Sequence, residues 1–194
     1  NNARDSDLYN VEIVSAAGAA AGVELNLFNQ TSDDMSIIGS AFDDTITGAE
    51  NANNTISGGN GNDDIYGQSD ADVLIGGAGN DYIDAGEDND TITGGTGNDR
   101  LYGDWGHDVF VGFENADSIN GGDGDDTLLL SGTSASLNVA ANWAVHSIET
   151  IDASGSNSLS GVVIDLYNQT SDDFTVIGSD YSDFIRGGRD NDLI

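Results

Sequence analysis

The sequence predicts an all-β fold, a right-handed parallel β-roll or β-solenoid in which short strands alternate with glycine-rich turns. A nine-residue pattern recurs along the middle of the chain, and a large apolar residue occupies the same place in each of its copies. Glycine supplies 27 of the 194 residues, about twice its usual share of roughly 7%. Cysteine and proline are absent, so we expect neither a disulfide framework nor a cysteine-ligated metal.

The charge balance excludes two classes of partner. There are 35 acidic residues against 4 basic ones, a net charge of -31 at pH 7. Such a surface repels phosphate groups and anionic lipids, so we expect no nucleic-acid binding and no adhesion to anionic membranes. The longest run of small apolar residues, 16–23, is too short and too glycine-rich for membrane insertion.

A long repeat divides the chain. Residues 25–40 return as the near-copy 164–179, at a constant offset of 139 residues. We therefore expect an internal piece of a longer protein made of tandem modules. The predicted parts are wider β-solenoid coils over 1–38, a β-roll over 39–129, an irregular connection over 130–147, wider coils of the next period over 148–177, and the start of a second β-roll over 178–194.

Within each period a nonapeptide carries an acid in its sixth place and an apolar residue in its eighth. The eighth places of the first array hold Ile46, Ile56, Ile65, Leu74, Ile83, Ile92, Leu101, Phe110, Ile119 and Leu128. The sixth places hold Asp44, Asp63, Asp72, Asp81, Asp90, Asp99, Asp108, Asp117 and Asp126, and in the restarted array Asp183 and Asp192. Asn54 is the exception. Alternation in a three-residue strand buries the eighth place, and the six residues before the strand make a turn.

Four segments, 58–66, 76–84, 94–102 and 121–129, match Gly-Gly-x-Gly-x-Asp-x-apolar-x in full. At this point the chain resembles the RTX (repeats-in-toxin) family, whose nonapeptide is a calcium-binding β-roll signature. The resemblance implies that several Ca²⁺ ions bridge turns on successive coils. Carboxylates of the sixth-place acids listed above would bind them, together with the turns of Gly59, Gly61, Gly77, Gly79, Gly95, Gly97, Gly122 and Gly124. The alternative is that the acids only make Asx-turn hydrogen bonds.

Two nonapeptides close one coil of about eighteen residues, which sorts the turns into two columns. The first column holds the turns that start at Gly39, Gly58, Gly76, Gly94 and Gly112. The second column holds those that start at Gly48, Gly67, Ala85, Gly103 and Gly121. The first matches the consensus better, so we expect it to bind calcium more tightly. Glycines in the first, second and fourth places are expected to permit positive φ.

The two outer faces of the predicted roll differ. One carries Thr and branched apolar residues, among them Thr55, Val73, Ile75, Thr91, Val109 and Val111. We expect this face to mediate self-association or contact with neighbouring modules. The alternative is that these residues reflect β-propensity alone.

No zinc-protease or serine-hydrolase motif is present, so we expect a protein that is not an enzyme. Two functions remain open. One is a calcium-stabilised structural module of a large secreted bacterial surface protein, such as a filament, S-layer or adhesin stalk. The other is the calcium-folding secretion domain of an exported enzyme or toxin. Both are extracellular, and weak multi-site binding suits millimolar calcium.

Overall fold

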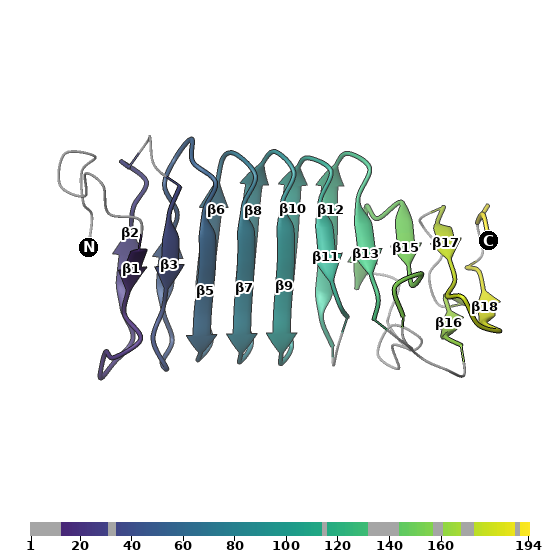
Figure 1. The fold of residues 1–194 in the computed structure, drawn as a ribbon, viewed down its shortest axis with the longest axis horizontal. Helices are drawn as coiled ribbons and strands as arrows, with labels where there is room; N and C mark the ends of the chain where they lie inside the picture. Colours follow the sequence, from purple (N-terminus) through teal and green to yellow (C-terminus); the bar gives the residue numbers. More distant parts are fainter. Residues whose placement is uncertain are drawn as a thin grey trace.

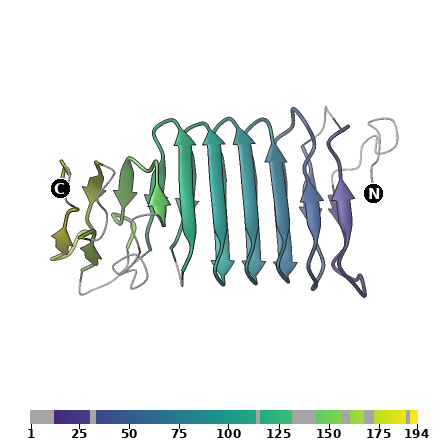
Figure 2. The same cartoon turned by 180° about the vertical axis from the view of Figure 1, so that it is seen from behind.

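The computed structural model describes residues 13–30, 34–113, 116–131, 144–156, 161–167, 173–188 and 191–194. All strands among these residues pair in parallel, and no helix is present among them. Figure 1 shows the strands standing in a row along the long axis, with the chain winding from one sheet to the other. Figure 2 shows the same row from behind. The predicted all-β solenoid is confirmed.

The strands form two long sheets and one short one. The nine-stranded sheet contains β1 (Ile13–Ser15), β3 (Ser36–Ile38), β5 (Thr55–Asn60), β7 (Val73–Ala78), β9 (Thr91–Thr96), β11 (Val109–Val111), β13 (Thr127–Leu129), β15 (Thr150–Asp152) and β17 (Thr175–Ile177). The seven-stranded sheet contains β2 (Glu24–Asn26), β4 (Thr45–Thr47), β6 (Asp64–Gln68), β8 (Tyr82–Glu87), β10 (Arg100–Trp105), β12 (Ser118–Asp123) and β14 (Val145–His146). The two-stranded sheet pairs β16 (Val163–Asp165) with β18 (Phe184–Arg186).

The strand register confirms the eighteen-residue coil of the array. Ile56 pairs with Leu74, and Leu74 pairs with Ile92. The eighth-place residues of the first array are 0–3% exposed, so the predicted ladder is the core between the two sheets. Because each coil contributes only two such side chains, the core is narrow. The buried sixth-place acids lie in the turns at its two edges.

The wider coils belong to the same solenoid. Ile37 of β3 pairs with Ile56 of β5. In the second period, Ile151 of β15 pairs with Leu128 of β13 on one side and with Val176 of β17 on the other. On this sheet the second period therefore stacks directly on the first. On the other side, among the described strands, the seven-stranded sheet ends at β14 and β16 pairs with β18 in a separate sheet. Within the predicted connection 130–147, residues 132–143 lie outside the described residues, and the domain boundaries stay a prediction.

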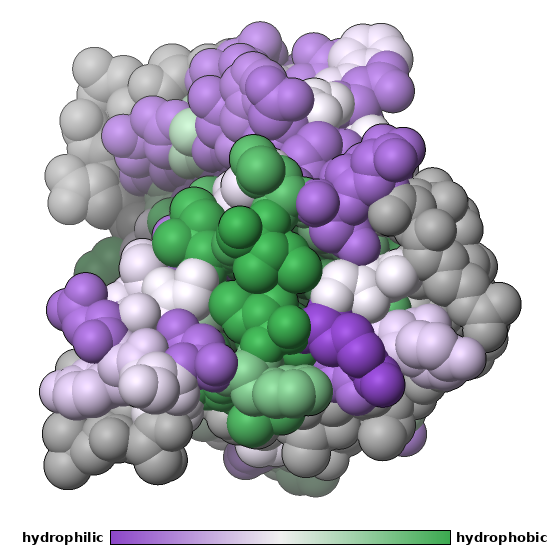
Figure 3. Space-filling view, turned by 90° about the vertical axis from the view of Figure 1, so that its right-hand side faces the viewer, coloured by the Kyte–Doolittle hydropathy of each residue, from purple (hydrophilic) through white to green (hydrophobic). Residues whose placement is uncertain are grey.

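The end of the solenoid formed by the last described residues shows the core in cross-section. Figure 3 views this end, where apolar side chains gather in a band with polar side chains on either side. Phe184, Leu193 and Ile194 are each more than half exposed here. At this end the apolar core thus lies between polar edges.

Candidate metal-binding turns

The sixth-place aspartates form two ladders, one in each column of turns. In the first column, the backbone N–H of Asp63 donates to Oδ1 of Asp81 at 2.9 Å, and that of Asp81 donates to Asp99 at 2.9 Å. In the second, the N–H of Asp72 donates to Oδ1 of Asp90 at 2.7 Å, and that of Asp90 donates to Asp108 at 2.8 Å. Each carboxylate therefore reaches back to the preceding coil, which confirms the two predicted columns.

The second carboxylate oxygen of seven of these aspartates is buried without a hydrogen-bond partner. They are Asp63, Asp72, Asp81, Asp90, Asp99, Asp108 and Asp126. Their side chains are only 1–2% exposed. A buried carboxylate that lacks a partner for one oxygen costs the folded state several kcal/mol. A cation beside each Oδ2 atom would remove that cost, and oxygen donors of this kind are those that Ca²⁺ prefers.

The pKa values of the buried aspartates also reflect their poor solvation. Burial is the largest cause and raises the pKa of Asp63, Asp81 and Asp126 to about 6. It raises the pKa of Asp72 to about 7 and that of Asp90 to about 8. Hydrogen bonds from the preceding coil oppose the rise, whereas neighbouring carboxylates add to it. Without a cation, burial therefore makes the ionised form of these carboxyl groups less favourable than it is in an exposed aspartate.

Backbone carbonyls supply a second set of oxygen atoms. The eight predicted second- and fourth-place glycines all have positive φ, between 106° and 147°. The carbonyl oxygen of Gly61 points at the Cα of Gly79 in the next coil so closely that a Cβ there would overlap it. Gly79 and Gly97 are related in the same way. The turns thus direct carbonyl oxygens along the stack, toward the neighbouring turn.

The expectation for the first-place glycines of the full matches is wrong. Gly58, Gly76 and Gly94 do not have positive φ. A Cβ on any of them would instead overlap Oδ2 of the aspartate in its own turn, such as Asp63 for Gly58. Close approach to the carboxylate, rather than backbone conformation, explains glycine in this place.

The turns that depart from the consensus keep the same backbone. Gln68 and Asp104 occupy second places with φ of 99° and 71°, and Asp70 and Asp88 occupy fourth places with φ of 65° and 77°. These left-handed conformations are unfavourable for residues other than glycine. The stacked neighbours hold them nevertheless, so the departures leave the aspartate ladder intact.

The first turn of each array differs from the rest. The Ser40 hydroxyl donates to Oδ1 of Asp44 at 2.9 Å, and its backbone N–H donates to Oδ2 at 2.5 Å. Ser179 makes the same pair of contacts with Asp183, at 2.7 and 2.8 Å. Both oxygens of these two acids therefore already have protein donors, which separates them from the seven aspartates with an unpartnered oxygen.

The last two predicted acids also lie in the ladders. Oδ1 of Asp117 accepts the backbone N–H of Asp99 at 3.0 Å, and Oδ1 of Asp192 accepts that of Phe174 at 3.2 Å. Asp117 is buried, whereas Asp192 is half-buried.

A further ladder, formed by the fifth-place side chains, was missed in the sequence. Oδ1 of Asn62 accepts the backbone N–H of Asn80 at 2.8 Å, and Oδ1 of Asn80 accepts that of Asn98 at 2.9 Å. In the other column, Nδ1 of His107 accepts the N–H of Asp125 at 2.8 Å. These bonds run to the following coil, opposite in direction to the aspartate ladder. The recurrence of Asn in the fifth place was the available signal.

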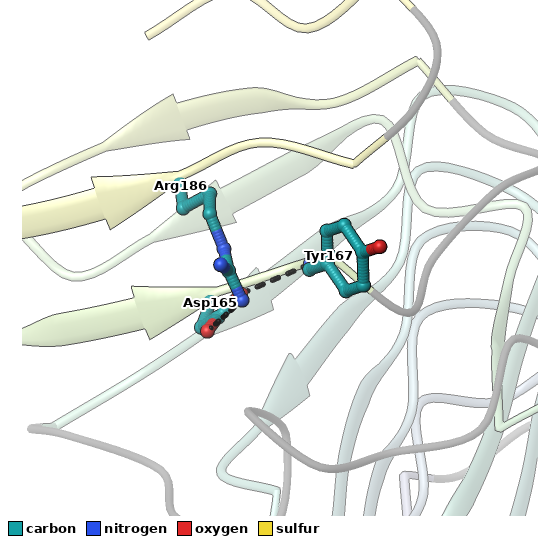
Figure 4. A network of polar contacts seen from close by, with 3 residues as sticks. All are labelled: Asp165, Tyr167 and Arg186. Carbon is teal, nitrogen blue, oxygen red and sulfur yellow. Dashed lines mark hydrogen bonds and ion pairs between the residues drawn. The ribbon is translucent and has the colours of Figure 1, made fainter.

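The second period carries its own link between coils. Arg186 of β18 donates to both oxygens of Asp165 in β16, from Nε at 2.7 Å and Nη2 at 2.5 Å. Its guanidinium also lies 4.7 Å from the ring centroid of Tyr167 (Figure 4). The hydrogen bond from Arg186 is the largest cause that lowers the pKa of Asp165. The group is exposed, so its contribution to stability is small.

Within the described ranges, no group of three or more acidic, histidine or cysteine side chains could by itself hold a metal ion. A calcium site in these turns would combine aspartate carboxylates with backbone carbonyls of the adjacent turn. The described residues also include no helix that is long and apolar enough to cross a membrane.

Comparison with known proteins agrees with this arrangement. The family model of the RTX calcium-binding nonapeptide repeat (4 copies) matches residues 36–53, 49–83, 84–114, 102–132 and 175–194, more than half of the chain. No curated protein and no solved structure matches the sequence. The stacked turns and the family match lead to one conclusion: the chain belongs to the RTX calcium-binding nonapeptide-repeat family and is a calcium-binding repeat module.

Proposed function

We propose that this module is a structural element of a large secreted bacterial surface protein, such as a filament, an S-layer or an adhesin stalk, and that it folds when it meets extracellular calcium. The observation that carries the proposal is the junction between the two periods. β15, which opens the second period, pairs directly with β13 at the end of the first array. Tandem periods joined in this way extend the nine-stranded sheet from one period into the next.

Calcium supplies the rigidity in this proposal. In the cytosol, where calcium is scarce, the buried aspartates would hold the chain unfolded, because their charges repel and their Oδ2 atoms lack donors. Outside the cell, each ion neutralises carboxylates and ties two coils together. No preformed site exists in the unfolded chain, so binding and folding are one event.

The chemistry of the turns also supports an extracellular location. Sites that combine one buried carboxylate with backbone carbonyls carry few charged ligands. Such sites suit the millimolar calcium outside cells better than cytosolic concentrations. RTX repeat proteins are typically secreted by bacteria, which agrees with this location.

The experiment is surface labelling of the source cells with an antibody raised against the calcium-loaded chain. The proposal expects the antigen on intact cells and its release by a calcium chelator. Antigen found only in the medium, on a polypeptide that also carries an enzyme domain, would support a secretion domain of an exported enzyme or toxin instead.

A further inference from the structure

The outer face of the nine-stranded sheet consists of the two outward residues on each strand. The first outward positions hold Ile13, Ser36, Thr55, Val73, Thr91, Val109, Thr127, Thr150 and Thr175. The second outward positions hold Ser15, Ile38, Ser57, Ile75, Thr93, Val111, Leu129, Asp152 and Ile177. Parallel pairing places equivalent positions in two straight rows along the solenoid. We call this surface the hydroxyl–aliphatic face.

The hydroxyl–aliphatic face is almost free of charge in a chain whose net charge is -31. Among the described positions of this face, Asp152, near one end, is the only ionisable residue. The opposite outer face, on the seven-stranded sheet, includes Asp64, Asp84 and Arg100 at equivalent positions. Since strand propensity acts on both sheets, it accounts for Thr, Val and Ile but not for the scarcity of acids on one side only.

Branched apolar side chains on the hydroxyl–aliphatic face are open to solvent. Val73, Ile75 and Val111 are 37–39% exposed, and Ile38 and Ile177 are 38% and 42% exposed. They alternate with hydroxyl residues along the rows, so that Thr55, Val73 and Thr91 follow one another on neighbouring strands. The face is therefore moderately apolar along its length, in the manner of a surface that packs against a second layer.

We infer that the hydroxyl–aliphatic face is an interface between two copies of this chain, packed sheet against sheet. A basic partner would be drawn to the acidic turns instead. Two highly acidic copies can approach closely only where few carboxylates face each other, and this face presents only that of Asp152 near one end. An interface that uses the same patch on both copies is the commonest form of self-association. This interface rests on the proposed structural role, and its partner is a second copy of the chain.

The face is small compared with a standard protein–protein interface. Nine strands spaced about 4.8 Å apart give a strip roughly 40 Å long, and two outward residues make it about 10 Å wide. Each copy would then bury roughly 400 Å², about half of the 800 Å² per partner in a standard interface. A pair of single chains should therefore associate only weakly. Tandem periods would strengthen the contact through multivalency.

The test is sedimentation velocity of the calcium-loaded chain over a concentration series up to about 1 mM. The chain should form a dimer, and the Val73→Asp/Val111→Asp variant should associate at least ten-fold more weakly. A matched control, Thr45→Asp/Ser118→Asp, adds the same charge to the outer face of the seven-stranded sheet and should dimerise like the parent chain. Circular dichroism in calcium checks that each variant is folded.

A second variant, Val73→Thr/Val111→Thr, keeps strand propensity and removes apolar contact, and it should also weaken the dimer. If the aspartate variant fails to fold, the threonine variant tests the interface in its place. Three results would each overturn the inference. They are a parent chain that stays monomeric at 1 mM, association that none of the face variants weakens, and open-ended oligomers in place of dimers. Folding in calcium without dimerisation would leave the proposed function standing, so the two failures are distinguishable.

Discussion

Replacing Asp81 by Asn should reduce the response of the chain to calcium while stabilising its calcium-free fold. Asp81 is 2% exposed, its Oδ2 atom lacks a partner, and burial raises its pKa from 3.8 to about 6. A pKa raised by about two pH units costs the folded state about 3 kcal/mol once the carboxylate is ionised at pH 7. The neutral amide avoids this cost.

Asn54 shows how the amide would fit. It occupies the sixth place of its own turn, and its Nδ2 atom donates to the carbonyls of Ala49 and Ala52 at 3.0 and 2.9 Å. Its Oδ1 atom still accepts a backbone N–H, from Ala49 at 3.0 Å. An amide can therefore satisfy itself with backbone oxygens of its turn, but its neutral oxygen is a weaker calcium ligand than a carboxylate.

The calcium response is the second part of this prediction. One site that binds only the folded state adds about 2.7 kcal/mol at a calcium concentration 100 times its Kd. The Asp81→Asn variant should lose about that amount from the difference between its stability in calcium and in chelator. Both stabilities are measured by far-UV circular dichroism, with urea in calcium and with a stabilising osmolyte in chelator.

Asp64→Asn is the matched control, because Asp64 is exposed on the outer face of β6 and loses the same charge. It should change neither quantity by more than about 0.5 kcal/mol. If Asp81→Asn behaved like this control in both conditions, the buried aspartates would have no special role in calcium-coupled folding.

Five further predictions follow from the turns. In chelator, lowering the pH from about 8 to 4 should increase β structure in circular dichroism spectra. The pKa values of the buried aspartates are higher in the folded chain than in the unfolded chain, for example about 8 for Asp90. Protonation therefore favours folding at low pH, and this effect is lost as pH rises through the folded-state pKa values. In calcium titrations, the half-saturating concentration should rise over the same fall in pH, because protons compete for the carboxylates. Gly79→Ala should lower the free energy of unfolding in calcium by about 2 kcal/mol or more, because φ is 138° and the added Cβ overlaps a carbonyl oxygen. Gly18→Ala is the control, since Gly18 has open space around it, and it should change the free energy of unfolding little in the same urea titration. Gln68→Gly should raise that free energy by about 1 kcal/mol, since it relieves a φ of 99°; a decrease would show that the glutamine side chain matters more than the strain. Asn80→Ala should cost about 1 kcal/mol in urea titrations by removing the acceptor for Asn98, and no change would show that the fifth-place ladder is dispensable.

Much of the fold could be predicted because each nonapeptide carries the same sequence pattern. A large apolar residue in every eighth place fixes the core, and the nine-residue spacing fixes which turns share a column. Ile56, Leu74 and Ile92 stack as expected for this reason. The second- and fourth-place glycines could be assigned to positive φ because few other residues adopt it easily.

Other features could not be predicted because they depend on contacts between coils. The need for glycine at Gly58 follows from the position of the Asp63 carboxylate, which only the folded turn reveals. The direction of the Asn62 bond, toward the following coil, also requires the stack to be known. Ser40 resembles an ordinary turn residue in the sequence, yet it supplies a donor to each carboxylate oxygen of Asp44. Each of these depends on an atomic position rather than on residue type.

The central claim is that calcium drives the folding of these turns, and the most direct test is a calcium titration of the chain that starts from chelator. Far-UV circular dichroism and hydrodynamic size are followed together at pH 7.5. We expect an expanded, largely unstructured chain in chelator and a cooperative gain of β structure with compaction as calcium is added. A chain already folded in chelator, with a spectrum that calcium does not change, would contradict the account.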